Sequence, residues 1–119
     1  MDQQITLIGN LTGDPVLDYS STGTPVARFR LAVNTPTKDP KVHEAVFIDC
    51  ETWRNQGEHV VERVRKGDRI IVVGRLVDKS WTDDKGNRHS RLVFRVNEAG
   101  LSLLYPGPPP TPDVPPEED

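Results

Sequence analysis

Cysteine, long apolar runs and targeting signals are scarce or missing in this 119-residue chain. Its one cysteine, Cys50, has no partner for a disulfide within the chain and is expected to be a small buried core residue. No apolar run approaches the roughly 20 residues that a membrane-spanning helix needs. The first residues lack the basic and then apolar pattern of a signal peptide. We therefore expect a cytoplasmic protein.

Groups of residues that carry catalytic or metal chemistry are missing as well. His43, His59 and His89 are isolated in separate parts of the chain, where surface positions are expected, and a single cysteine excludes a CxxC metal pair. No glycine spacing matches the phosphate-binding motifs GxxxxGK(S/T) or GxGxxG. Nothing in the pattern assembles a nucleophile, a base and an oxyanion site. We expect no catalytic residue, no metal and no cofactor, and interpret the chain as a binding protein.

Positive charge is not in excess, because the formal net charge is −3. The two signs are segregated, however. All 15 lysines and arginines precede residue 106, whereas four of the 18 acidic residues follow it. Residues 1–105 thus carry a net charge of +1 and residues 106–119 carry −4. Because binding follows the local field, the overall charge does not exclude a nucleic acid as partner.

The end of the chain differs in composition from the rest. Residues 106–119 hold seven of the 11 prolines and no aromatic residue. Such a segment buries too little apolar surface to fold, and its prolines favour an extended polyproline conformation. We therefore predict one folded domain over residues 1–105 and a disordered, proline-rich acidic tail over 106–119.

The folded part shows a pattern that is typical of a small barrel. Strands are predicted at residues 3–9, 26–34, 45–54, 69–81 and 90–97. One helix is expected at 55–67, where Asn55 and Glu58 match a capping box and Gly67 suits a C-terminus. This order predicts an all-β OB-fold, a five-stranded Greek-key barrel with one short helix between strands 3 and 4. Residues 101–105 are expected to add a short strand.

The two-residue period of a strand assigns the faces of these elements. The inward residues are expected to be Ala27, Phe29, Leu31 and Val33 in the second strand, Val46, Ile48, Cys50 and Thr52 in the third, and Leu92, Phe94 and Val96 in the fifth. The opposite face of the third strand then presents Phe47, Asp49, Glu51 and Trp53 to solvent. Two large rings therefore lie on the side that should meet water.

A third ring repeats this arrangement. Trp81 falls in the same phase of its strand as Arg75 and Lys79. Rings interleaved with cations suit a single-stranded nucleic acid, because bases stack on the rings while cations follow the phosphates. The alternative is that Phe47, Trp53 and Trp81 cover a subunit interface or a minor core. Three rings in basic surroundings favour the nucleic acid.

Four segments carry a family resemblance: ITLIGNLTGDP at 5–15, GTPVARFRLAVN at 23–34, FIDCETWRNQGEHVVERVRKGDRIIVVGRL at 47–76 and KSWTDDKGNRH at 79–89. In order and spacing they resemble bacterial-type single-stranded DNA-binding proteins, most of all the actinobacterial branch with its phage and plasmid relatives. The resemblance covers about residues 1–105. It implies an OB-fold, a homotetramer built as a dimer of dimers, and sequence-tolerant binding of single-stranded DNA in replication, recombination or repair.

The resemblance also implies which residues contact DNA. The stacking rings of the family correspond to Phe47, Trp53 and Trp81. We expect the DNA path around them to be lined by Arg28, Arg30, Lys38, Lys41, Arg54, Arg75, Lys79 and Arg91. In the actinobacterial relatives an extra strand after the core clamps two subunits, which residues 101–105 would provide here.

The sequence departs from the family in two places. The loop at 35–38 lacks the further aromatic residue that the family often has there. The chain ends in Glu118-Asp119, whereas the family usually ends in acidic residues followed by Pro-Phe. We therefore do not expect partners that recognise that ending to dock on this tail. A different class of function stays open, namely an OB-fold protein-interaction module of the primosome type that binds nucleic acid weakly. Such a module has no need of three rings in basic surroundings.

Overall fold

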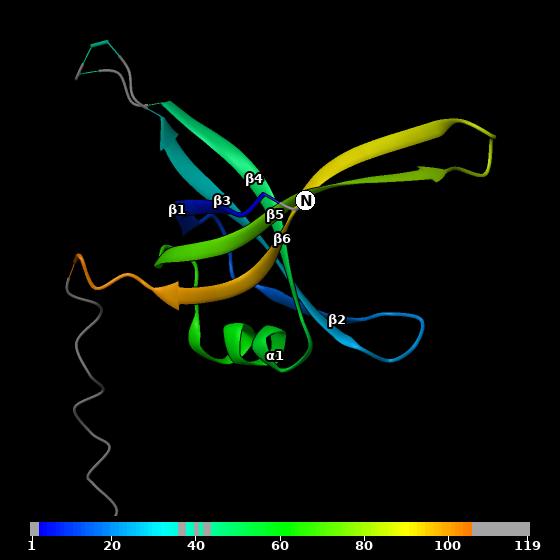
Figure 1. The fold of residues 1–119 in the computed structure, drawn as a ribbon, viewed down its shortest axis with the longest axis horizontal. Coiled ribbons are helices and arrows are strands. Elements are labelled where there is room, and N and C mark those ends of the chain that lie inside the picture. Colours follow the sequence, from blue (N-terminus) through cyan, green and yellow to red (C-terminus); the bar gives the residue numbers. More distant parts are fainter. Residues whose placement is uncertain (1–2, 36–37, 40, 42–43, 106–119) are drawn as a thin grey trace, which may run out of the picture.

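The computed structural model describes residues 3–35, 38–39, 41 and 44–105. These residues form β1 (Ile5–Leu11), β2 (Val16–Tyr19), β3 (Pro25–Thr35), β4 (Glu44–Trp53), α1 (Arg54–Arg63), β5 (Arg69–Thr82) and β6 (Arg88–Leu101) (Figure 1). The strands follow the order β1-β5-β6-β4-β3-β2, and a further pairing of β1 with β3 closes five of them into a barrel. Strands β4 and β6 pair in parallel, and the other pairs are antiparallel. The predicted OB-fold is confirmed.

The short strand β2 is an element that the sequence did not predict. It pairs antiparallel with β3 as the outer strand of a hairpin that projects from the barrel (Figure 1). Its four residues, VLDY, are too few to show a strand period. Because β2 lies outside the closed ring, α1 still falls between the third and fourth barrel strands, as predicted, although it follows the strand labelled β4.

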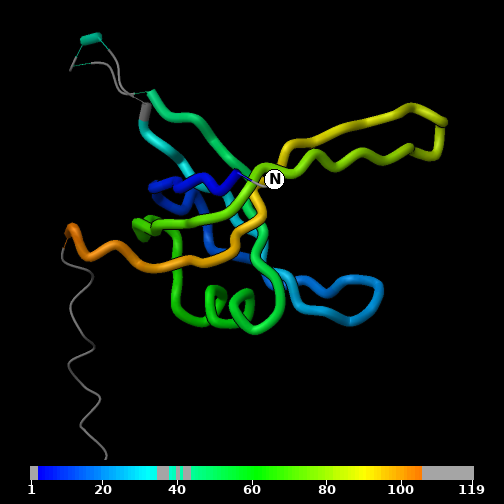
Figure 2. The backbone as a smooth tube through the Cα atoms, viewed as in Figure 1, coloured from blue at the N-terminus to red at the C-terminus, as the bar shows by residue number. Residues whose placement is uncertain are grey.

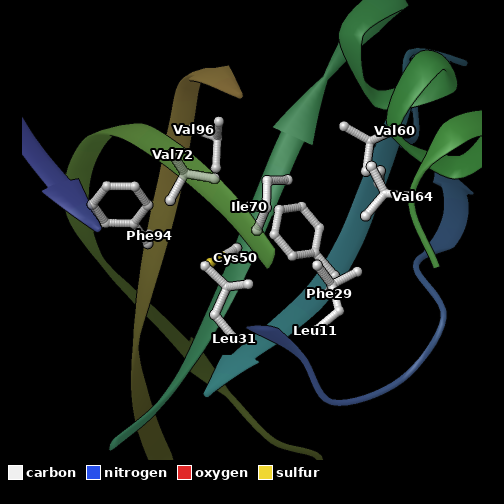
Figure 3. Close-up of a cluster of buried hydrophobic side chains, with 11 residues drawn as sticks. Leu11, Phe29, Leu31, Cys50, Val60, Val64, Ile70, Val72, Phe94 and Val96 are labelled. Carbon is white, nitrogen blue, oxygen red and sulfur yellow. The ribbon is translucent and has the colours of Figure 1, made fainter. Parts of the chain in front are cut away.

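Alternate residues of the barrel strands fill the interior (Figure 3). Leu31, Ile70 and Phe94 come from three different strands and are almost completely buried. Side chains of this size stabilise a fold by about 1.5–3 kcal/mol each when fully buried. Cys50 lies in the same core, and burial, with the nearby charge of Asp49, raises the pKa of its thiol to about 12. The thiol therefore stays protonated at neutral pH, and the prediction of a core cysteine is confirmed.

Two predicted core positions are wrong, because Val46 and Leu92 are both about half exposed. The parallel contact between β4 and β6 begins at Cys50 and Phe94. Val46 precedes this contact in β4, and Leu92 precedes it in β6. At both positions the strand runs beyond the barrel. Side chains still alternate between its two sides there, but the inward side no longer has a core to face.

The helix α1 packs against the barrel through Val60 and, just after its last residue, Val64 (Figure 3). Gly57 lies on the buried side of the helix. A Cβ at this position would lie 2.6 Å from the carbonyl oxygen of Thr52 and 3.0 Å from the backbone nitrogen of Ala27. The missing side chain therefore lets the helix approach β3 and β4 closely.

Both predicted ends of the helix are displaced. The N-cap is Trp53, with no side-chain hydrogen bond at the cap, so the predicted capping box of Asn55 and Glu58 is wrong. Arg54 adopts a positive φ of 65°, which turns the chain sharply out of β4. The helix ends at Arg63, and Gly67 lies beyond it in the turn before β5, with a φ of 90°. This glycine therefore supports that turn and not the helix terminus.

Strands β5 and β6 continue past the barrel as a long two-stranded ribbon (Figure 2). Strand β1 accompanies β5 only as far as Gly74, whereas β5 and β6 stay paired out to Thr82 and Arg88. The carboxylate of Asp83 accepts a hydrogen bond from the backbone N–H of Asn87 and so closes the tip. The ribbon carries its side chains away from the core.

The predicted separate strand at 101–105 is wrong, because Leu101 is the last residue of β6 and residues 102–105 form no strand. The tail at 106–119 lies outside the described residues, so the domain boundary stays a prediction. Within the described part of the chain, no helix has the length and apolar character needed to cross a membrane.

Candidate nucleic-acid interface

The three predicted rings are accessible to different degrees. Phe47 in β4 is 61% exposed and Trp81 in β5 is 48% exposed, whereas Trp53 at the end of β4 is half-buried. Phe47 and Trp53 lie on the same side of β4, about 20 Å apart at roughly 3.3 Å per residue. Trp81 lies on the projecting ribbon. The rings therefore mark separate points along the surface and not one aromatic cluster.

Two of the rings border hollows in the outer surface. One hollow of about 390 Å³ is lined by Arg28, Glu51, Lys79, Trp81 and Arg91. Another, of about 500 Å³, is lined by Trp53, Arg54, Gln56, Arg95, Val96 and Asn97. A third, of about 340 Å³, includes Arg28, Arg30 and Arg91 in its lining. Because Arg28 and Arg91 line two of the hollows, these cations form a continuous path from β3 to the ribbon.

The cations of this path are paired with carboxylates. Arg28 lies 2.6 Å from Asp18, and Arg30 lies 3.0 Å from Asp49. Arg91 lies 3.7 Å from the second oxygen of Asp49. These pairs are partly exposed, and pairs of that kind contribute about 0–1 kcal/mol, so a phosphate can replace the carboxylate. The sequence predicted the cations but not their partners, which come from other strands.

Glu51 departs most from its predicted place, because it is 2% exposed although it lies on the outward side of β4. Its carboxylate lies 2.6 Å from Lys79 Nζ and 3.1 Å from Arg95 Nη2. The indole N–H of Trp53 donates to the same carboxylate at 3.2 Å. Burial alone would raise the pKa of Glu51, but the hydrogen bonds from Lys79, Trp53 and Arg95, together with the charge of Lys79, outweigh it and lower that pKa below its ordinary value. We call these four residues the Glu51 cluster.

Arg95 is a member of this cluster that the prediction missed. It lies in β6 an even number of residues from Arg91 and shares its outward face, and that spacing was the available signal. Its guanidinium carbon is 5.8 Å from the centre of the Trp53 ring, and Lys79 Nζ is 5.9 Å from the same centre. Both distances fall within the range of cation–π attraction.

His89 is exposed, as predicted, but it is not isolated from other side chains. Its ring stacks on Trp81 with the ring centres 5.4 Å apart and the planes inclined by 22°. Its Nε2 lies 2.7 Å from Asp83, and this contact, with a hydrogen bond from Asn87, lowers the pKa of Asp83 below its ordinary range. The ribbon pairs Trp81 directly with His89, so one face of the Trp81 ring is covered by protein. The other face is the one available to a base.

The remaining predicted cations are spread more widely. Lys38 and Lys41 are exposed between β3 and β4, at the end of a strand pair that leaves the barrel in a different direction from the ribbon (Figure 1). Arg75 is half-buried opposite Arg95, on the outward face of β5. Arg54 lines the hollow beside Trp53. None of the three hollows includes Lys38, Lys41 or Arg75 in its lining.

Of the other two histidines, the one that the structure describes lines none of the three hollows. His59 is exposed on α1, and His43 lies outside the described residues. Among the residues that the structure describes, no three His, Cys, Asp or Glu side chains are grouped so that they would hold a metal ion.

Comparison with known proteins gives a consistent result. The family model described as the single-strand binding protein family matches residues 2–102. The chain is 39% identical over 110 residues to the "Single-stranded DNA-binding protein" of Mycobacterium bovis, covering 87% of this chain and 66% of that protein. It is 38% identical to "Single-stranded DNA-binding protein 2" of Streptomyces coelicolor, covering 83% and 52%. It is also 38% identical to the "Single-stranded DNA-binding protein" of Thermus aquaticus, covering 98% of this chain and 50% of that protein. The chain thus spans about half to two thirds of the length of these relatives.

Proposed function

The chain belongs to the single-strand binding protein family, and from this premise we propose that it binds single-stranded DNA with little preference for sequence. The observation that carries the proposal is the exposed Trp81 ring beside Arg28, Lys79 and Arg91 in one hollow. Binding of this kind would protect single strands during replication, recombination or repair. Such a role would place the protein in the cytoplasm, with the nucleoid.

The physical basis of the proposal is stacking combined with charge. Every base has a flat face, so an exposed indole accepts all four bases with similar affinity. In a duplex those faces are already stacked, and the rings then have nothing to bind. The path of Arg28, Arg30 and Arg91 supplies the cations that follow the phosphates. The names of the relatives favour this function over a protein-interaction module of the primosome type.

The direct test is a fluorescence titration with oligo(dT). We expect the oligonucleotide to quench tryptophan emission, because Trp53 and Trp81 are the two tryptophans of the chain and both border the candidate path. A blunt duplex of the same length serves as the control and should quench much less. No quenching by oligo(dT) at low salt would refute the proposed function.

We also propose that the protein is a homotetramer, a dimer of dimers. Ile8 of β1 and Ile71 of β5 lie opposite each other and are 40% and 36% exposed, which leaves apolar surface on the outside of the barrel. Leu101 and Leu103 are also exposed, and residues 101–105 are proposed to reach a neighbouring subunit.

Light scattering should therefore give a mass near four times the 13.3 kDa of one chain. Association is expected because burying these apolar residues between subunits removes them from water. Ile8→Lys, which places a charge on the proposed contact, should lower the mass. A mass near that of a single chain for the unmodified protein would contradict the assembly, and a stable dimer would point instead to the primosome-type module.

A further inference from the structure

The outward face of β4 holds a charged group where a solvated residue was expected. Glu51 is 2% exposed, yet it keeps its charge through Lys79 at 2.6 Å and Arg95 at 3.1 Å. These partners are supplied by β5 and β6, so one carboxylate links three strands of the barrel. A buried carboxylate of this kind is stable only while its partners stay in place, because losing one leaves charge uncompensated.

The same carboxylate fixes a ring of the candidate interface. The indole N–H of Trp53 donates to Glu51 at 3.2 Å, and both cations lie within 6 Å of the ring centre. The orientation of Trp53 is therefore coupled to the positions of Lys79 and Arg95. The four groups form a single preorganised unit.

Building on the proposed function, we propose that Glu51 is a positioning residue that holds Trp53 for base stacking and withholds Lys79 and Arg95 from the phosphates. The two cations are then committed to the protein. Binding at this part of the surface depends on stacking, whereas binding along Arg28 and Arg30 depends on charge.

Exposure separates the two kinds of cation. The side chain of Arg30 is 57% exposed and its partner Asp49 is 30% exposed, so water and salt screen the pair and a phosphate can displace it. Lys79 is 35% exposed, and its partner Glu51 is buried. A phosphate that replaced Glu51 as the partner of Lys79 would leave the buried negative charge of Glu51 with one cation fewer to balance it. We therefore expect Lys79 to displace few counterions from the DNA phosphates when DNA binds.

The test uses the salt dependence of binding. The logarithm of the affinity falls with the logarithm of the salt concentration by about 0.7 for each phosphate contact to a single strand. In the full chain, Arg30→Ala should reduce this slope by about 0.7, whereas Lys79→Gln should change it by much less. Glu51→Gln keeps the size of the side chain and an oxygen for the indole, but removes the charge. It should steepen the slope by up to about 1.4 and tighten binding at low salt, because two cations become available.

A double substitution gives the sharpest comparison. In the Glu51→Gln background, Lys79→Gln should now reduce the slope by about 0.7, the full value that it lacks in the parent. Asp78→Asn is the matched control for charge. Asp78 is exposed and adjacent to Lys79 in β5, but it faces the opposite side, so its removal should leave the slope unchanged.

The outcomes separate this inference from the proposed function. If the parent chain does not bind oligo(dT), both are overturned. If the parent binds but Glu51→Gln weakens binding equally at all salt concentrations, Glu51 is only structural and the inference alone is overturned. Circular dichroism and the thermal midpoint report whether Glu51→Gln folds. If it does not fold, Lys79→Gln in the parent decides, because loss of the full slope of about 0.7 would overturn the inference and a smaller loss supports it.

Discussion

Replacing Trp53 or Trp81 by alanine is expected to weaken oligo(dT) binding by about 5- to 150-fold for each ring. Stacking of one base on an aromatic side chain contributes roughly 1–3 kcal/mol, which corresponds to that range. The loss should persist at high salt, because stacking does not depend on counterion release. Titration at two salt concentrations, followed by the emission of the remaining tryptophan, measures it. Trp81→Ala also removes the ring on which His89 stacks, so His89→Ala should be measured beside it.

Tyr19→Ala is the matched control for loss of an exposed ring. Tyr19 is 63% exposed at the end of β2, and it follows Asp18, whose side chain is turned to Arg28. Strand alternation therefore directs Tyr19 to the other side, away from the cation path. Its removal should leave affinity unchanged. If both tryptophan variants bind as tightly as the parent but change the mass of the assembly, the rings serve a subunit interface and the stacking assignment is wrong.

Gly74→Ala is expected to lower the free energy of unfolding by about 1–3 kcal/mol, which is the usual cost of forcing extra volume into a packed site. An added Cβ would overlap the carbonyl oxygen of Arg95 and lie 2.9 Å from its carbonyl carbon and 3.0 Å from Val96 Cα. These are backbone atoms, so no side-chain rotation relieves the contact. The register of β5 and β6 shifts between Val73 and Gly74, which is where the glycine allows the two strands to approach. Urea unfolding measures the loss.

Gly100→Ala provides the control in the same strand pair. A Cβ at Gly100 would meet nothing within 4 Å, and the position lies opposite Ile71 in the ladder. Alanine loses less backbone entropy than glycine on folding, so this change should be neutral or stabilise by roughly 0.5–1 kcal/mol. Equal unfolding curves for the two variants would show that the close approach of β5 and β6 at Gly74 is not what constrains that site.

The sequence predicts features that depend on a short local period. Phe47, Trp53 and Trp81 lie on the accessible side because alternation along one strand determines the face of each residue. The same reasoning fails at Val46 and Leu92, where the strands outrun the barrel. Alternation shows which residues share a side, but not where the neighbouring strand stops.

Burial of Glu51 shows a second limit. Its partners, Lys79 and Arg95, are 28 and 44 residues away in the chain, and only the pairing of three strands brings them together. The stacking of His89 on Trp81 was missed as well, because the predicted strand began only at residue 90, whereas β6 begins at Arg88 and pairs His89 with Trp81. The strand β2 was missed for a different reason, since its pairing with β3 and not its own pattern makes it a strand.

The indoles of Trp53 and Trp81 differ in mechanical compliance, because Trp81 lies toward the free end of the β5–β6 ribbon and Trp53 lies on the barrel. Among the described residues, β1 accompanies β5 no further than Gly74 and β4 pairs with β6 only from Phe94 onward. The ion pairs Lys79–Glu51 and Arg91–Asp49 still tie the base of the ribbon to β4, and beyond them β5 and β6 alone carry Trp81. A lone pair of strands is marginally stable in water, whereas Trp53 is tied to the barrel through Glu51. A bound strand must immobilise the ribbon before it gains the contact with Trp81, and that costs conformational entropy. Under the proposed function, Trp53 would therefore hold a bound strand at a fixed point, while Trp81 would adjust its position to the strand.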